Sequence, residues 1–195
     1  QVKEGLPLVR FGTLIGAPLN TLIVLKDGPV KAIADLKGRK IGYSVASFQD
    51  AYLDAILKSA GLTRNEVTEV NVNFNLVTAL LSGQVDAAID GYRNFELIQL
   101  EIEGKPGVAF YPEEHGVPPY DELIYVTAAG KRDDPRLPRF LAAVREATEY
   151  IVAHPAEAQA MFMKAHPDLN DTLNQRAFAA TLPLFARDPA ALDRA

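Results

Sequence analysis

The stretch Gly-Tyr-Ser-Val-Ala-Ser-Phe-Gln-Asp at residues 42–50 marks a change from strand to helix. The short run Lys40–Tyr43 is typical of a buried strand, and Phe48 begins the apolar stripe of an amphipathic helix. Ser47 is a good N-cap for that helix, and its neighbouring backbone N–H groups stay available to a ligand. Ser44 offers a second hydroxyl group. We therefore expect this turn to form one wall of a site for a small polar ligand.

A second polar segment, Asp-Gly-Tyr-Arg-Asn-Phe-Glu at residues 90–96, follows a small apolar strand expected at 85–89. The carboxyl ends of neighbouring parallel strands meet at one edge of a sheet, where open α/β sheets bind their ligands. The two polar turns are therefore expected to share a binding cleft. Because the chain has no G-x-S-x-G, P-loop or dinucleotide motif, we expect a binding protein without catalytic residues.

Hydrophobic periodicity and turn residues predict an α/β fold. We expect strands at 8–11, 22–25, 40–43, 70–74, 85–89, 108–111 and 123–127, and helices at 48–60, 76–82, 137–153, 156–165 and 170–185. Strands that alternate with helices predict a mainly parallel sheet with right-handed crossovers.

The order of these elements predicts two lobes. Residues 25–120 are expected to form a complete α/β lobe, and residues 1–24 with 121–195 the remainder of the other lobe, including the helices at the end of the chain. A lobe inserted through two extended crossings is typical of a hinged protein.

Composition excludes several classes of function. The 195 residues carry a net charge of −5, which disfavours general affinity for nucleic acid or an anionic membrane. No apolar run approaches the roughly 20 residues of a membrane span. The chain has no cysteine, and its three histidines lack a metal-binding spacing. We expect no metal, no cofactor, no nucleic-acid partner and no transmembrane segment.

Two segments resemble the type II periplasmic solute-binding proteins. They are Asp-Leu-Lys-Gly-Arg-Lys-Ile-Gly at residues 35–42 and Leu-Leu-Ser-Gly-Gln-Val-Asp-Ala at residues 80–87. Such segments are common across that superfamily, so they indicate the fold more than the ligand.

Three further segments, residues 18–25, 71–76 and 91–96, resemble the branch that binds thiamin-pyrimidine precursors for an ABC transporter. The resemblance implies a ligand such as N-formyl-4-amino-5-aminomethyl-2-methylpyrimidine, a membrane permease as partner, and a periplasmic or lipid-anchored extracellular location. Members of that branch begin with about half a domain that this chain lacks. The first lobe is therefore expected to be incomplete at its N-terminus.

Five side chains join Ser44, Ser47 and Phe48 as candidates for the ligand site. Glu96 can accept hydrogen bonds from a 4-aminopyrimidine, or can serve as a solvated residue at a helix start. Tyr92 can stack on an aromatic ring or belong to the core. Asn94 and Asn75 are each a helix cap or a ligand contact. Asn20 can reach the cleft from the first crossing.

Two alternatives remain open at the level of the sequence. The first is a pyrimidine-synthesising enzyme of the same fold, which consumes its own histidine and a bound pyridoxal phosphate; that group carries a Cys-rich iron-binding motif, whereas this chain has no cysteine. The second is a binding protein for another solute, such as a sulfonate, a flavin precursor or a nitrogenous anion. Arg93 is the one basic candidate for binding an anion, and Glu96 argues against an anion.

Overall fold

The computed structural model describes residues 5–45 and 50–191 of the chain. The chain divides into two units, which we call the inserted unit (Leu19–Pro119) and the terminal unit (Gln1–Pro18 with Tyr120–Ala195). The first boundary lies before β2 (Asn20–Leu25), not after residue 24 as the sequence had indicated. The reason is that β2 is hydrogen-bonded on both sides within the inserted unit.

The inserted unit is built on a five-stranded sheet. Its strand order is β4 (Thr68–Asn71), β3 (Lys40–Tyr43), β5 (Ala87–Tyr92), β2 and β6 (Gly107–Phe110). Strand β3 is parallel to β4 and β5, whereas β2 is antiparallel to both β5 and β6. The sheet is therefore mainly parallel with one reversed strand. That reversal brings the start of β2 to the edge of the sheet where its neighbours end.

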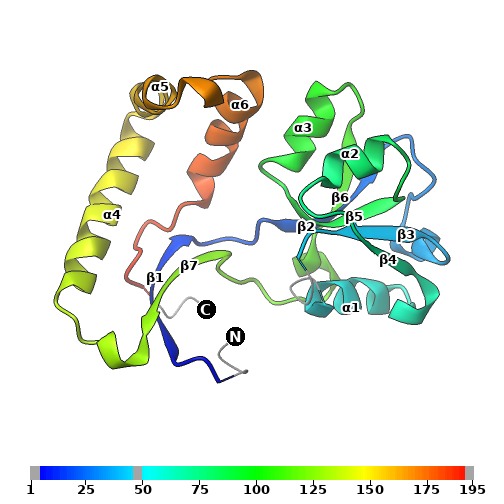
Figure 1. The fold of residues 1–195 in the computed structure, drawn as a ribbon, viewed down its shortest axis with the longest axis horizontal. Helices are drawn as coiled ribbons and strands as arrows, with labels where there is room; N and C mark the ends of the chain where they lie inside the picture. Colours follow the sequence, from blue (N-terminus) through cyan, green and yellow to red (C-terminus); the bar gives the residue numbers. More distant parts are fainter. Residues whose placement is uncertain (1–4, 46–49, 192–195) are drawn as a thin grey trace. The chain divides into compact units, whose positions relative to one another are not determined.

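Both faces of this sheet are buried. Helix α1 (Asp50–Ser59) covers one face, while α2 (Leu76–Leu81) and α3 (Glu96–Ile102) cover the other (Figure 1). The alternation of a strand is visible in β2, because Leu22 packs in the α1 cluster and Ile23 packs in the α2–α3 cluster. Burial on both faces explains the apolar runs of the central strands β2 and β5.

Strand β4 differs from the strand expected at residues 70–74, which was wrong at both ends. It begins at Thr68 and ends at Asn71. The side-chain oxygen of Asn71 accepts a hydrogen bond from the backbone N–H of Asn73 at 2.9 Å, and Asn73 has a φ of 51°. This local turn competes with the strand, so the chain leaves the sheet before Phe74.

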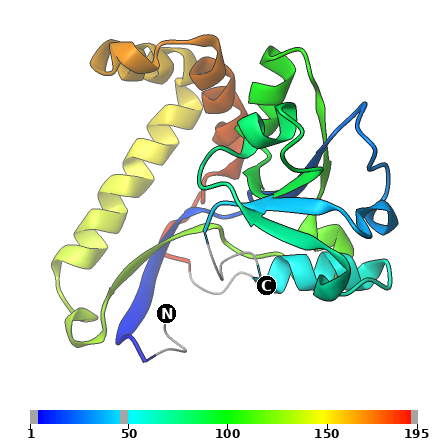
Figure 2. The same cartoon turned by 45° about the vertical axis from the view of Figure 1, so that its right-hand side comes forward.

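The terminal unit combines a two-stranded sheet with helices. Strand β1 (Leu8–Ile15) pairs in antiparallel fashion with β7 (Leu123–Ala128). The helices that follow β7 are seen from another direction in Figure 2; they are α4 (Arg136–Ala153), α5 (Pro155–Ala165) and α6 (Thr172–Thr181). The last helix was expected to reach residue 185. It ends at Thr181, where a 3₁₀ turn containing Pro183 follows.

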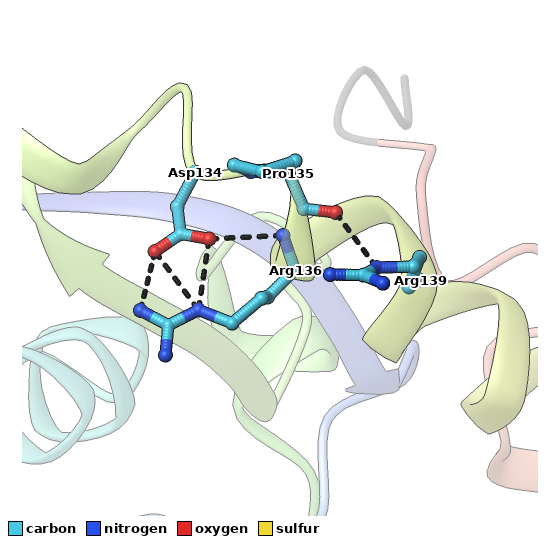
Figure 3. A network of polar contacts seen from close by, with 4 residues as sticks. All are labelled: Asp134, Pro135, Arg136 and Arg139. Atoms are coloured by element: carbon cyan, nitrogen blue, oxygen red, sulfur yellow. Dashed lines mark hydrogen bonds and ion pairs between the residues drawn. The ribbon is translucent and has the colours of Figure 1, made fainter.

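The start of α4 is fixed by a charged network (Figure 3). The carboxylate of Asp134 accepts a hydrogen bond from the backbone N–H of Arg136 at 2.9 Å and bonds to the guanidinium group of the same residue. Arg139 Nε donates to the carbonyl oxygen of Pro135 at 3.3 Å. The Arg136 side chain holds the pKa of Asp134 well below its usual range. Asp134 therefore satisfies a free N–H group at the helix start.

None of the helices in the described ranges is long and apolar enough to cross a membrane. Within the same ranges, no three His, Cys, Asp or Glu side chains gather closely enough to hold a metal ion.

Candidate functional site

A cavity of about 510 Å³ opens in the inserted unit, at the edge of the sheet where β3 and β5 end. Its lining comes from the start of β2, the turns after β3 and β4, the end of β5 and the first residues of α2 and α3. The described residues that line it are Asn20, Ser44, Val45, Phe74, Leu76, Asp90, Tyr92, Phe95 and Glu96. The position agrees with the rule that open α/β sheets bind ligands at the carboxyl ends of their strands.

Strand β5 carries a β-bulge at this edge. Thr21 pairs with Gly91 and Ile23 pairs with Ala88, so β5 holds one residue more than β2 between the two pairs. Asp90 lies within this bulge and has a φ of 72°, a left-handed conformation that is uncommon for a residue other than glycine. The bulge turns the Asp90 side chain towards the cavity that it lines.

The carboxylate of Asp90 ties the end of β5 to the turn after β3. Its Oδ2 accepts hydrogen bonds from the backbone N–H and the hydroxyl group of Ser44, both at 3.0 Å, and from the backbone N–H of Val45 at 3.4 Å. Burial raises the pKa of Asp90, and these bonds partly oppose that rise. The turn that the sequence singled out is therefore held by a carboxylate of the second polar segment.

Glu96 is the first residue of α3 and supplies a second carboxyl group. Its Oε2 accepts a hydrogen bond from the backbone N–H of Tyr92 at 2.6 Å, which fixes the side chain against the end of β5. Burial raises the pKa of Glu96, and the bond from Tyr92 opposes that rise. A half-buried carboxyl group held in this way is a directed acceptor for N–H groups of a ligand.

Arg93 is engaged away from the cavity. Its guanidinium group forms two hydrogen bonds with the Glu113 carboxylate, at 2.7 and 3.0 Å, and stacks 4.3 Å from the ring centre of Tyr111. Among the described residues that line the cavity there are two carboxyl groups and no Arg or Lys. The electrostatic character of the lining therefore favours a cation or a donor-rich ligand over an anion.

Aromatic rings supply much of the remaining lining. Phe74 is 84% exposed, in the turn between β4 and α2, while Tyr92 and Phe95 are half-buried. Exposed aromatic faces beside directed polar groups are suited to a small planar ligand.

The structure places the eight candidate residues in three groups. Asn20, Ser44, Tyr92 and Glu96 line the cavity. Asn75 and Asn94 do not belong to its lining; Asn75 holds the N-cap position of α2 without a side-chain cap bond, and Phe95 holds the N-cap position of α3 that was expected for Asn94. Ser47 and Phe48 lie outside the described residues.

Five lining residues were not among the eight named candidates, although three of them lie within the segments 42–50 and 90–96 that were expected to form the cleft. The five are Val45, Phe74, Leu76, Asp90 and Phe95. Phe74 had been assigned to the last position of the strand expected at residues 70–74, so its exposure was not foreseen. The dipeptide Asp90-Gly91 directly after an apolar run is a turn signal that could have indicated the bulge.

Comparison with known sequences gives a consistent set of relatives. The chain is 52% identical over 194 residues to the "Putative thiamine biosynthesis protein" of Haemophilus influenzae, covering 99% of this chain and 62% of the relative. It is 29% identical to the formylaminopyrimidine-binding protein of Halalkalibacterium halodurans, covering 94% and 56%. It is 27% identical to the 4-amino-5-hydroxymethyl-2-methylpyrimidine phosphate synthase of Legionella pneumophila, covering 98% and 61%. The chain thus spans about 60% of the length of these relatives.

Solved structures with the same fold are periplasmic binding proteins. The alkanesulfonate-binding protein of Xanthomonas axonopodis pv. citri matches with a TM-score of 0.69 at 18% identity, over 93% of this chain and 61% of that one. The aliphatic sulphonate binding protein of Escherichia coli matches with a TM-score of 0.70 at 19% identity, over 94% and 61%. At such identities the likeness concerns the fold alone, which is that of the type II periplasmic binding proteins.

A protein-family model provides the assignment. The model described as "NMT1/THI5 like" matches residues 1–158, which include the whole inserted unit and its cavity. The relatives found by sequence carry names related to thiamin and its pyrimidine precursors, and the fold is the one that the resemblance of residues 35–42 and 80–87 implied. The chain therefore belongs to the NMT1/THI5-like family.

Proposed function

We propose that this protein is the substrate-binding component of an ABC importer and that it captures a 4-aminopyrimidine precursor of thiamin. A suitable ligand is N-formyl-4-amino-5-aminomethyl-2-methylpyrimidine. The observation that carries this proposal is the carboxyl group of Glu96, held by the Tyr92 backbone in a cavity with aromatic lining.

The chemistry of a 4-aminopyrimidine matches this lining. Its amino group donates hydrogen bonds in the plane of the ring, and its ring nitrogen becomes a further donor when protonated. A carboxylate accepts such bonds with charge assistance. The flat faces of the ring suit contacts with Tyr92, Phe74 or Phe95.

A sulfonate is a poorer match, although the structural neighbours include sulfonate-binding proteins. A sulfonate needs donors or positive charge, whereas the described lining presents the carboxyl groups of Asp90 and Glu96. Arg93, the one basic candidate in the sequence, is neutralised by Glu113. Repulsion between like charges therefore argues against an anionic ligand here.

An enzyme is the second candidate, because several relatives are named 4-amino-5-hydroxymethyl-2-methylpyrimidine phosphate synthases. The synthase resemblance implies a Cys-rich iron-binding motif, and the 195 residues of this chain contain no cysteine. Incubation of the full-length protein with iron and pyridoxal phosphate distinguishes the two functions. Formation of the pyrimidine phosphate would favour the synthase.

Calorimetry on the full-length protein tests the transport function directly. We expect saturable binding of the N-formyl aminopyrimidine and none of ethanesulfonate at about 1 mM, the range of very weak binding. Saturable binding of the sulfonate without the pyrimidine would contradict the proposal. A permease as partner, a location outside the cytoplasmic membrane and hinge closure belong to the same proposal. Copurification of the full-length protein with its permease tests the partner.

A further inference from the structure

Asp90 brings a second carboxyl group to the cavity, and one of its two oxygen atoms has no hydrogen-bond partner among the described residues. The residue is 8% exposed and lines the cavity. Its Oδ2 accepts all the hydrogen bonds described above, from Ser44 and Val45. Its Oδ1 is buried and has no hydrogen-bond partner among the described residues. A buried carboxylate oxygen without a donor is costly, so its presence needs an explanation.

The backbone conformation of Asp90 also needs an explanation. Its φ of 72° is a conformation that glycine adopts without strain and other residues adopt at a cost. Bulges of this kind occur near binding sites, where they redirect a side chain. An aspartate at such a position therefore calls for a role that the side chain supplies.

We propose that Asp90 Oδ1 is a second acceptor for the ligand and that it selects 4-aminopyrimidines carrying a second N–H donor, with an ammonium group preferred. This inference rests on the proposed function, since it assigns Glu96 to the aminopyrimidine and Asp90 to its substituent. The role of Asp90 restricts the ligand to a narrower class than the fold alone indicates.

The electrostatics of the lining supports the preference for an ammonium group. Two carboxyl groups share a cavity whose described lining contains no Arg or Lys. An aminomethyl substituent is a cation at neutral pH, and its N–H groups would satisfy Oδ1 and neutralise one charge. A formylated substituent offers one neutral N–H donor, and a methyl group offers none. The expected order of affinity is therefore aminomethyl, then formylaminomethyl, then methyl.

The other role open to Asp90 is a purely structural one. Its hydrogen bonds to Ser44 and Val45 hold the turn after β3. In this role an aspartate is required at position 90 without any contact to the ligand. A structural role would affect all ligands alike, because the turn is shared by all of them. A ligand-binding role would affect only ligands with the second donor.

Calorimetry with three probes on the full-length protein separates these roles. The probes are 4-amino-5-aminomethyl-2-methylpyrimidine, its N-formyl derivative and 4-amino-2,5-dimethylpyrimidine. We expect the wild-type protein to bind the aminomethyl probe at least about 10-fold more tightly than the dimethyl probe, the ratio of one charge-assisted hydrogen bond. In Asp90→Asn the ratio should fall below about 3-fold, because the aminomethyl probe loses its charged acceptor and the dimethyl probe never used it.

Asp86→Asn is the matched control. Asp86 also accepts a hydrogen bond from a β3 backbone N–H, that of Lys40 at 3.0 Å, and it does not line the cavity. This variant removes the same charge from the same unit and should keep the wild-type ratio. Asp90→Gly provides a second variant at the bulge, because glycine adopts the observed φ without strain. Circular dichroism establishes that each variant is folded.

Two results would overturn the inference about Asp90. One is a wild-type ratio near 1. The other is an Asp90→Asn variant that weakens all three probes equally, which would assign the residue to the turn alone. Failure of the proposed function looks different, because then the wild-type protein binds none of the probes, including the dimethyl compound that depends on Glu96. That result would overturn both.

Discussion

At the scale of single residues, Glu96 decides whether the cavity recognises an aminopyrimidine. We predict that Glu96→Gln weakens binding by about 1.5–3 kcal/mol, because a charged acceptor is lost while the shape of the side chain is kept. Calorimetry on the full-length protein measures this change. Glu103→Gln, at the exposed end of α3, is the control and should leave affinity unchanged. Equal affinity of wild type and Glu96→Gln would assign Glu96 to the helix start alone.

The same residue should make stability depend on pH. Burial raises the pKa of Glu96, so the folded protein holds this proton more firmly than the unfolded chain does. The stability that this provides is fully present below the ordinary glutamate pKa of about 4.3 and is lost as pH rises through the raised value.

We therefore predict that ligand-free Glu96→Gln gains stability relative to wild type as pH rises from about 4 to 8, since the variant has no proton to lose there. Thermal unfolding across this range provides the measurement. A difference in melting temperature that stays constant with pH would show that the substitution acts through packing instead.

Glu96, Tyr92 and Ser44 were singled out from the sequence because they follow strand ends, and Asn20 because it lies at the first crossing; all four line the cavity. Asp90 lies in the segment expected to form the cleft, but the direction of its side chain was not foreseen, for a physical reason. Its placement depends on a bulge between β5 and β2, and such a register shift arises from pairing between segments far apart in the chain. Periodicity within one segment carries no information on it.

At the scale of elements, the contact between β5 and β2 depends on the absence of a side chain at Gly91. A Cβ atom there would overlap Cδ1 of Ile23, a buried residue of β2. We predict that Gly91→Ala costs about 1–3 kcal/mol of unfolding free energy through overpacking. Urea unfolding of the full-length protein measures it.

A double-mutant cycle shows whether that clash is the cause. Ile23→Val removes Cδ1, so Gly91→Ala should cost less in the Ile23→Val background than in the wild type. Additive costs in the two backgrounds would mean that Gly91 is required for the backbone of the bulge rather than for the space beside Ile23.

The existence of a helix or strand was predictable where its hydrophobic periodicity was strong. Its first and last residues were less predictable. The long helices α4 and α5 begin and end within one residue of the expected positions. Their boundaries were predictable because Pro155 and Pro167 interrupt the helical pattern. Strand β4 was misplaced because the side chain of Asn71 forms a local turn that a hydrophobic pattern does not register. The reversed direction of β2 follows from where the chain enters the inserted unit, which is a non-local property.

At the scale of the whole molecule, the hydrophobic core is distributed unevenly. The two clusters of buried residues that flank the sheet lie entirely within the inserted unit. In the terminal unit, the 18-residue helix α4 buries only Leu141 and Thr148 among the described residues. The apolar side chains Ile124 and Val126 of β7 are 44% and 47% exposed. The stability of the two units should therefore differ.

We predict that an isolated fragment of residues 19–119 folds by itself. Its sheet is covered on both faces, and both crossings to the terminal unit fall at its ends. A domain of this size whose buried clusters share one sheet is expected to unfold cooperatively in urea, with a free energy of about 5–10 kcal/mol. Ile41→Ala is the control, because Ile41 is fully buried in β3 and its truncation should lower that free energy by about 2–5 kcal/mol. A gradual transition that Ile41→Ala does not shift would contradict the prediction, since it would mean that the core of the inserted unit forms only together with the rest of the protein.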